Sequence, residues 1–334
     1  MSRINHVILG FAAAVAGVSG VLPNAAAADG LPNVVVFLMD DMGIGDCRAY
    51  DEHCQLDLPH LESLADRGMV FTDAHSPAAV CAPTRYSILT GNYPWRGRDP
   101  DGTWGFQLKS QILAGQETVA DLLRRRNYRT SFFGKEHLGG GFYLKATGEQ
   151  IDRWKYTPDE VDWSRPVPEG LQTKGFDTVY SLPNGIQNRP YAFFRNGLLV
   201  GDPDRLRTWE KGRYGDSTIK ADGWGVPDWD SSQAGPILTR EALAFLDAHF
   251  AANAQANRRR PCLLYSSSQS CHTPHTPPAR LGGKAVRGAS GLSDHLDMIV
   301  EADVTLGLMM ERIAEAGEAA NTLYLFTSDN GGLS

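Results

Sequence analysis

Oxygen-bearing side chains gather directly after two apolar runs of the sequence. The first cluster occupies residues 40–46 and begins with the adjacent carboxylates of Asp40 and Asp41. The second is a glycine-rich turn at 328–332, which offers the carboxylate of Asp329 and the amide oxygen of Asn330. Adjacent carboxylates repel each other unless a cation neutralises them, and hard divalent ions take such oxygen ligands. Each cluster alone is compatible with a solvated polar turn, but two clusters at strand ends could converge on one metal ion.

A cysteine stands where a helix is expected to start, with a proline and an arginine close behind it. The segment 81–85 reads Cys-Ala-Pro-Thr-Arg, and Thr90 and Gly91 follow. A thiol with a low pKa beside Arg85 could act as a nucleophile. No Cys-His relay motif accompanies Cys81, so the residues alone leave its chemistry open.

Two further short motifs read Gly-Lys-Glu-His at 134–137 and His-Thr-Pro-His at 272–275. Together with the three segments above, they resemble the motifs of the formylglycine-dependent sulfatases. The hallmark of that family is C-x-[PA]-[ST]-R with T-G five residues beyond the arginine, and every one of those positions is matched here. All five motifs occur in the family's order, over nearly the whole chain after residue 28. Segments 175–177 and 190–197 look like the arylsulfatase branch of the family.

The resemblance implies a nucleophile and a metal ion. In that family the cysteine, here Cys81, is oxidised after translation to formylglycine, an aldehyde whose hydrate attacks sulfur. A single Ca²⁺ ion would contact the residue at 81 and the four oxygen-bearing residues of the two clusters, namely Asp40, Asp41, Asp329 and Asn330. The oxygen preference of Ca²⁺ agrees with this set.

The resemblance also assigns catalytic roles, to Cys81, Arg85, Lys135, His137 and His272. Arg85 and Lys135 would stabilise the nucleophile's oxygen and the charge on the transferring sulfuryl group. His272 would protonate the leaving alcohol, and Lys135 and His272 would also bind substrate. His137 would take the proton from the remaining hydroxyl, so that the aldehyde re-forms and sulfate leaves. Glu136 departs from the pattern, because the family usually carries an aromatic residue at that position.

The reaction implied is hydrolysis of a sulfate ester, on a sulfated small molecule or carbohydrate. A formylglycine-generating maturation enzyme is the implied protein partner. Two other functions stay open: a phosphodiesterase or phosphonate monoester hydrolase of the same superfamily, and a truncated, non-catalytic fragment that binds anions or partners. The second arises because family members continue well beyond the position of Ser334, with a second active-site lysine and a smaller antiparallel-sheet domain. We therefore expect residues 29–334 to be a sulfatase N-terminal catalytic α/β domain that lacks the C-terminal subdomain.

Apolar runs alternate with helical patterns along the chain, which is typical of an α/β fold. We expect a mostly parallel or mixed central sheet sandwiched by helices, as in the sulfatase and alkaline phosphatase-like folds. The expected strands are 33–39, 69–74, 128–133, 262–266 and 322–327. The expected helices are 59–67, 117–126, 236–250 and 293–316. The candidate site residues fall just after these strands, where open α/β sheets place their sites. Residues 144–229 show no clear periodicity, and we expect their five tryptophans to pack rather than to stack on sugars.

The composition is that of an ordinary globular protein, with 334 residues, 42% of them hydrophobic, and a formal net charge of −7. This acidic balance argues against a nucleic-acid-binding protein. The N-terminus differs, because Arg3 and His6 precede an apolar run at 7–21 and small residues at 25–28. This pattern is typical of a secretory signal peptide over residues 1–28. The run has about 15 residues, whereas a membrane span needs roughly 20. We expect an exported protein, periplasmic or secreted, with no membrane span after cleavage.

Five cysteines are an odd number for an exported protein. Cys47 could pair with Cys54, and Cys262 with Cys271, or some or all of them are buried thiols. Cys81 has no partner in this scheme, and conversion to formylglycine would account for it. On the long helix at 293–316, Asp297 and Asp303 are expected to serve packing or capping.

Overall fold

The apolar run that precedes the first acidic cluster forms β1 (Asn33–Met39), a strand buried along nearly its whole length. The computed structural model describes residues 30–100, 103–256 and 259–332. The signal peptide expected over residues 1–28 lies outside these described residues. Strand β1 runs parallel to β10 (Cys262–Ser267) on one side and to β13 (Thr322–Ser328) on the other. Continuous β-branched and aromatic sequence suits a strand that is covered on both faces.

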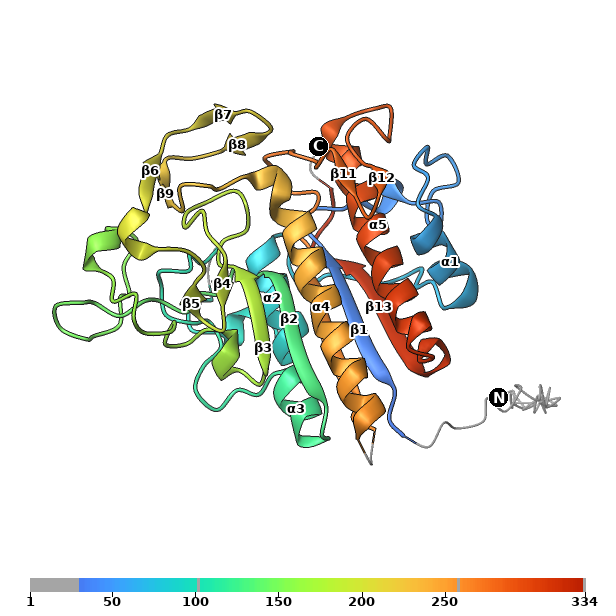
Figure 1. The fold of residues 1–334 in the computed structure, drawn as a ribbon, viewed down its shortest axis with the longest axis horizontal. Coiled ribbons are helices and arrows are strands. Elements are labelled where there is room, and N and C mark those ends of the chain that lie inside the picture. Colours follow the sequence, from blue (N-terminus) through green and yellow to red (C-terminus); the bar gives the residue numbers. More distant parts are fainter. Residues whose placement is uncertain (1–29, 101–102, 257–258, 333–334) are drawn as a thin grey trace, which may run out of the picture. The chain divides into compact units, whose positions relative to one another are not determined.

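A seven-stranded sheet forms the centre of the fold, in the order β13-β1-β10-β2-β3-β4-β5 (Figure 1). Strands β2 (Arg129–Lys135) and β3 (Thr178–Leu182) continue the parallel part. The short strands β4 (Phe194–Arg195) and β5 (Leu198–Leu199) add antiparallel pairs at the far edge. The predicted fold class, a mostly parallel or mixed α/β sheet, is confirmed.

Helices cover both faces of this sheet, because successive side chains of a strand point to opposite sides. Val35 and Phe37 of β1 pack in one core cluster with residues of α4 (Ala234–Gln255) and α5 (Asp294–Glu315). Val36 and Leu38 pack in another with residues of α2 (Cys81–Thr90) and α3 (Val119–Arg125). Figure 1 shows α4 in front of the sheet and α2 behind it.

Helix α1 (Pro59–Arg67) packs beside α5 and takes its N-terminal cap from that helix. The Asp303 carboxylate accepts hydrogen bonds from the backbone N–H of Leu61 at 2.8 Å and of His60 at 3.5 Å. Asp297 accepts from the backbone N–H of Gly288 and of Ser290. Both aspartates therefore have the packing and capping role that the sequence predicts for them.

The strand predicted at 69–74 is wrong, because these residues form irregular loop. Met69 is 77% exposed and Phe71 is 60% exposed. The segment does not reach an edge of the sheet to pair with, and β-propensity without a neighbouring strand does not form one. In contrast, β3, β4 and β5 form where no strand was predicted: β3 pairs with the edge of β2, β4 pairs with β3, and β5 pairs with β4.

Apart from β3, β4 and β5, which belong to the central sheet, residues 144–229 form short elements and loops around an aromatic cluster. Two small antiparallel pairs lie there: β6 (Arg207–Trp209) with β9 (Gly223–Gly225), and β7 (Gly212–Tyr214) with β8 (Ser217–Ile219). The Trp163 and Trp224 rings meet edge to face with their centroids 5.2 Å apart. Of the five tryptophans in this region, only Trp154 is mostly exposed. Packing, as predicted, accounts for the other four.

The remaining elements are short. Strands β11 (Arg280–Leu281) and β12 (Lys284–Ala285) form a hairpin. Single 3₁₀ turns lie at Ile44–Asp46, Pro94–Arg96, Pro158–Glu160, Leu171–Thr173, Pro203–Arg205, Ser231–Gln233 and Ala319–Asn321. No helix in the three described ranges combines the length and the apolar character needed to cross a bilayer.

Candidate active site

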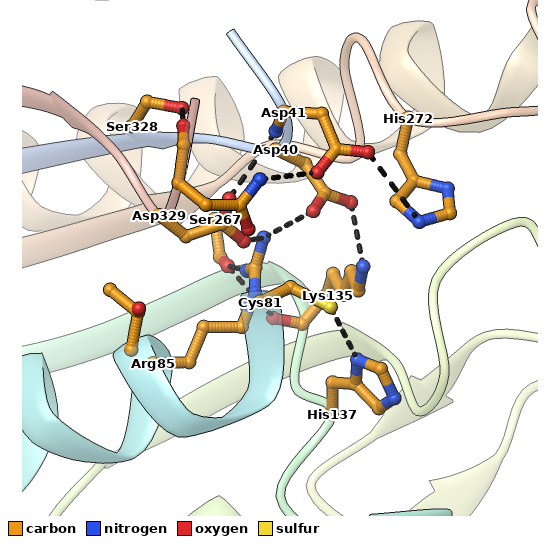
Figure 2. A network of polar contacts seen from close by, with 12 residues as sticks. Asp40, Asp41, Cys81, Arg85, Lys135, His137, Ser267, His272, Ser328 and Asp329 are labelled. Atoms are coloured by element: carbon orange, nitrogen blue, oxygen red, sulfur yellow. Dashed lines mark hydrogen bonds and ion pairs between the residues drawn. The ribbon is translucent and has the colours of Figure 1, made fainter. Parts of the chain in front are cut away.

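All nine site residues predicted from the sequence come together at the carboxyl ends of four parallel strands (Figure 2). Asp40 and Asp41 follow β1, Asp329 and Asn330 follow β13, and His272 lies in the loop after β10. Lys135 ends β2, with His137 two residues on, while Cys81 and Arg85 come from α2. Eight of the nine are buried, and His272 is partly exposed. The site is therefore a buried polar cluster with one histidine at its rim.

The strand ends hold two of these side chains by unusual backbone conformations. Asp41 has φ of 67° and His137 has φ of 56°, in the left-handed region that few residues other than glycine adopt. Gly134, with φ of 122°, lets β2 approach β10 closely, because a Cβ there would lie 1.7 Å from the carbonyl oxygen of Ser267. Such strain persists where the surrounding structure enforces it, and functional sites are common places for it.

Two cations lie among the carboxylates. Lys135 Nζ donates to Asp40 Oδ2 at 2.7 Å, and Arg85 Nη2 donates to Asp329 Oδ2 at 2.7 Å. Burial alone would raise the pKa of the Asp40 carboxyl, but Lys135 and Arg85 together hold it below its ordinary value. Burial raises the pKa of Asp329 to about 7, against the attraction of Arg85. The cluster therefore keeps Asp40 ionised. Additional positive charge near Asp329 would be needed to lower its raised pKa.

Three buried oxygens in the cluster accept no hydrogen bond: Asp40 Oδ1, Asp41 Oδ2 and Asn330 Oδ1. Asn330 donates its own amide N–H to Asp41 Oδ1 at 2.6 Å, which leaves the Asn330 oxygen free for another partner. Ligand atoms of Asp40, Cys81 and Asp329 lie within 4.8 Å of one another, and so do those of Asp40, Asp41 and His272. Buried oxygens without a hydrogen bond are rare in folded proteins, and of these three only Asp40 Oδ1 forms an ion pair with an arginine, with Arg85 Nη2 at 3.2 Å. This oxygen-rich set fits a hard divalent cation such as Ca²⁺.

Cys81 is the first residue of α2, and its sulfur faces a histidine. The Cys81 Sγ lies 3.2 Å from Nδ1 of His137. Figure 2 marks this contact with a dashed line. Burial raises the pKa of the Cys81 thiol, although Lys135 and Arg85 act in the opposite direction. The low-pKa thiolate that Arg85 suggested is therefore wrong, because burial and the neighbouring carboxylates outweigh the two cations.

The two histidines differ in their surroundings. Burial, followed by Lys135 and Arg85, holds the pKa of His137 well below its ordinary value, so its ring is neutral near pH 7. Burial also lowers the pKa of His272, while Asp40 and Asp41 counteract it. The backbone carbonyl of Thr273 lies 2.7 Å from His272 Nδ1, which assigns the proton to Nδ1 and leaves Nε2 toward Asp41, 3.7 Å from Oδ2. His137 is thus a base, and His272 presents an exchangeable nitrogen at the rim.

Ser267 belongs to the cluster, although sequence reasoning passed over it. Its hydroxyl accepts a hydrogen bond from Arg85 Nη1 and donates to the backbone carbonyl of Lys135 at 2.7 Å. The available signal was its place at the end of a buried strand, five residues before the histidine motif. Ser267 ties the guanidinium of α2 to the end of β2.

Glu136 lies between Lys135 and His137 and is buried, and its carboxyl contacts β3 instead of the site. The Ser181 hydroxyl donates to Glu136 Oε1, and burial raises the pKa of this carboxyl to about 7. All five cysteines are free thiols, so the two disulfides that the spacing allowed do not form in the structure. Cys262 and Cys271 are buried thiols instead.

The sulfatase family model matches residues 32–334, which is most of the chain. The chain belongs to the sulfatase family. Among curated relatives of this sulfatase chain, the N-acetylgalactosamine-6-O-sulfatase of Bacteroides thetaiotaomicron is 28% identical, over 90% of this chain and 59% of the relative. Human arylsulfatase A is also 28% identical, over 90% of this chain and 52% of the relative.

This chain is also similar to a solved structure whose description concerns the metabolism of multiple glycosaminoglycans by Bacteroides thetaiotaomicron. It matches with a TM-score of 0.73 and 27% identity, over 91% of this sulfatase chain and 63% of that chain. The chain thus spans about half to three fifths of the length of the curated relatives it matches.

Proposed function

We propose that this sulfatase-family chain hydrolyses sulfate esters, with residue 81 as the nucleophile after oxidation of Cys81 to formylglycine. One observation carries the proposal: Cys81 starts a helix at the edge of a buried cluster in which two cations face three carboxylates. A helix start beside Lys135 and Arg85 suits an anionic group, and sulfate is one. Family membership and the sulfatase names of the relatives support the same reaction.

One Ca²⁺ ion would be held by Asp40, Asp41, Asp329 and Asn330, with the residue at 81 completing the set. Three oxygens of these residues that accept no hydrogen bond support this assignment. When bound, the ion would supply positive charge that polarises a sulfate oxygen. A divalent cation would also lower the raised pKa of Asp329, because it would favour the ionised carboxylate.

The chain's own residues then divide the work. Formylglycine, once formed and hydrated by one water molecule, carries two hydroxyl groups on one carbon: one attacks sulfur, and the other loses its proton so that sulfate can leave and the aldehyde re-forms. His137 is the base for that proton, since it is neutral and 3.2 Å from the atom at position 81. Arg85 and Lys135 stabilise the charge of the sulfuryl group. His272 at the rim, once its Nε2 has taken up a proton, donates that proton to the departing alcohol.

The substrate we propose is a sulfated carbohydrate or small molecule. The relative named N-acetylgalactosamine-6-O-sulfatase favours a carbohydrate. We further propose that a formylglycine-generating enzyme matures the protein, and that residues 1–28 direct its export to the periplasm or the exterior. Residues 29–334 would then be the catalytic part of the mature chain.

The first test is the mass of the tryptic peptide 68–85, from protein purified out of its native host. Conversion to formylglycine replaces the sulfur of Cys81 by oxygen and removes two hydrogen atoms, and the change is read directly from that mass. The second test compares turnover of an aryl sulfate and an aryl phosphodiester by the matured protein, with Cys81→Ala as the inactive control. We expect the modified peptide and a preference for the sulfate ester. Unmodified cysteine in a host that matures other sulfatases, or a strong preference for the phosphodiester, would contradict the proposal.

A further inference from the structure

A carboxyl group lies buried beside the active site without a cationic partner. Glu301, on α5, is only 2% exposed, and burial raises its pKa to about 8. No lysine, arginine or histidine of the described residues forms an ion pair with it. Burying such a group costs free energy unless its hydrogen bonds are satisfied. A buried carboxyl without a cation therefore needs a hydrogen bond that offsets part of this cost.

That contact is with the turn that follows β10. The Ser270 hydroxyl donates to Glu301 Oε2 at 3.2 Å. The Ser270 carbonyl accepts from the backbone N–H of Asp40 at 2.8 Å, and the next N–H, that of Cys271, donates to the Asp40 carbonyl at 2.6 Å. The turn therefore bonds both the backbone N–H and the backbone carbonyl of Asp40. His272 follows directly, and its N–H closes the turn by donating to the carbonyl of Gln269 at 3.0 Å.

The neighbouring helix leaves room for the Glu301 carboxyl. Gly235, in the first turn of α4, has no side chain, and a Cβ there would lie 1.6 Å from Glu301 Oε1. A cavity of about 20 Å³ lies at this junction of α4, α5 and the end of β10, lined by polar groups that include Gln269, Thr239 and Thr305. Glu301 Oε1 accepts no hydrogen bond from these protein groups. Helix α5 thus supplies the Glu301 side chain, and the glycine in α4 leaves the space that its carboxyl occupies.

We propose that Glu301 is a positioning residue for the active site: through Ser270 it fixes the turn that sets Asp40 and His272. The inference rests on the proposed function where turnover is its readout. The contact that the inference depends on is the hydrogen bond from the Ser270 hydroxyl to a carboxyl oxygen of Glu301. A glutamine at 301 keeps that acceptor, whereas a methionine of similar length does not.

Turnover of an aryl sulfate by matured variants tests the role. Glu301→Met is expected to lower kcat at least tenfold with a smaller change in KM, and Glu301→Gln is expected to stay within threefold of the wild type. Ser270→Ala should match Glu301→Met, and the double variant should be no worse than either, because both remove one interaction. Glu301→Met with wild-type kcat, or a double variant whose losses multiply, would overturn the role.

Thr305→Val is the matched control. Thr305 lies on the same helix and lines the same cavity, but its hydroxyl bonds to Thr239 Oγ1 at 2.9 Å and to the Glu301 carbonyl at 3.0 Å, not to the turn. Its kcat should equal that of the wild type even if its melting temperature falls. A kcat for Thr305→Val as low as that of Glu301→Met would reduce Glu301 to a merely structural residue.

Calcium binding by calorimetry keeps this inference separable from the proposed function. Loss of a group that orients a metal ligand typically weakens metal binding about 10- to 100-fold. Glu301→Met should therefore bind Ca²⁺ at least tenfold more weakly, while Glu301→Gln binds normally. If the wild type binds Ca²⁺ without hydrolysing sulfate esters, the proposed function fails. The role of Glu301 is then still decided by the Ca²⁺ affinities of Glu301→Met and Glu301→Gln. If Glu301→Met does not fold, Ser270→Ala takes its place, and a wild type with neither activity nor Ca²⁺ binding overturns both proposals.

Discussion

The ion pair between Lys135 and Asp40 gives a prediction that can be worked through from the structure. Both side chains have 0% exposure, and the Lys135 Nζ lies 2.7 Å from Asp40 Oδ2. Removing one partner of a buried pair typically costs about 3–5 kcal/mol of unfolding free energy, because the other charge stays buried. Asp40 keeps a second cation, Arg85 Nη2, at 3.2 Å from its other oxygen. Lys135→Met, which keeps most of the volume, should therefore cost about 3 kcal/mol, at the lower end of that range.

The loss should depend on pH. In the wild type the pKa of Asp40 is lowered, so its stabilising contribution is present above the ordinary carboxyl pKa and is lost as pH falls through the folded value. Without Lys135 we expect burial to outweigh Arg85 and to raise the pKa of Asp40, so that the variant would lose stability as pH rises above about 4. The difference between the two proteins should therefore be larger at pH 7.5 than at pH 4.5.

Urea unfolding at these two pH values, with a chelator present to exclude metal binding, measures both effects. The matched control is Lys109→Met, because Lys109 Nζ lies 3.8 Å from Asp152 Oδ2 in a partly exposed pair. Such a pair contributes about 0–1 kcal/mol. A loss below about 1 kcal/mol for Lys135→Met, or an equal loss at both pH values, would refute the electrostatic account of the site.

Three further outcomes follow from particular contacts. His137→Ala should lower kcat by about 10²- to 10⁴-fold in steady-state assays with little change in KM, as expected for loss of a base; wild-type kcat would remove His137 from the reaction. Ca²⁺ at 100 times its dissociation constant should raise the unfolding free energy by about 2.7 kcal/mol in urea titrations, and no shift at saturating Ca²⁺ would rule out the proposed site. Asp303→Ala should cost about 1–2 kcal/mol through loss of the α1 cap, with turnover unchanged; a thermal melt and an aryl sulfate assay check both halves, and unchanged stability would contradict the capping role.

The long strands could be predicted because each is a continuous apolar run followed by polar residues. This pattern located β1, β10 and β13 within a residue or two, and it also located the point where Asp40 and Asp329 meet although 289 positions separate them. Parallel strands bring their carboxyl ends to one edge of the sheet. The convergence of the two oxygen clusters therefore follows from local pattern and one rule of topology.

The rest depends on contacts that leave no local pattern. Strand β4 has two residues and exists only because β3 offers it a partner. Ser267 is one of several serines in its segment, and only the arrival of the Arg85 guanidinium from α2 makes it part of the site. The thiol of Cys81 illustrates the electrostatic limit, because Arg85, four residues further along the sequence, suggested a lowered pKa. Burial decides the sign, and burial is a property of the whole fold.

Strand β13 forms an outer edge of the sheet in the described part of the chain, and its burial alternates from residue to residue. Leu323 is 49% exposed and Leu325 is 47% exposed, on the face that continues Val34 and Val36 of β1. Such an edge presents unpaired backbone groups beside apolar side chains, which is a template for strand addition. An extended segment that paired with β13 would extend the sheet at this edge. Because Asp329 follows the last residue of β13, such pairing would reach the side of the active site where we propose the Ca²⁺ ion.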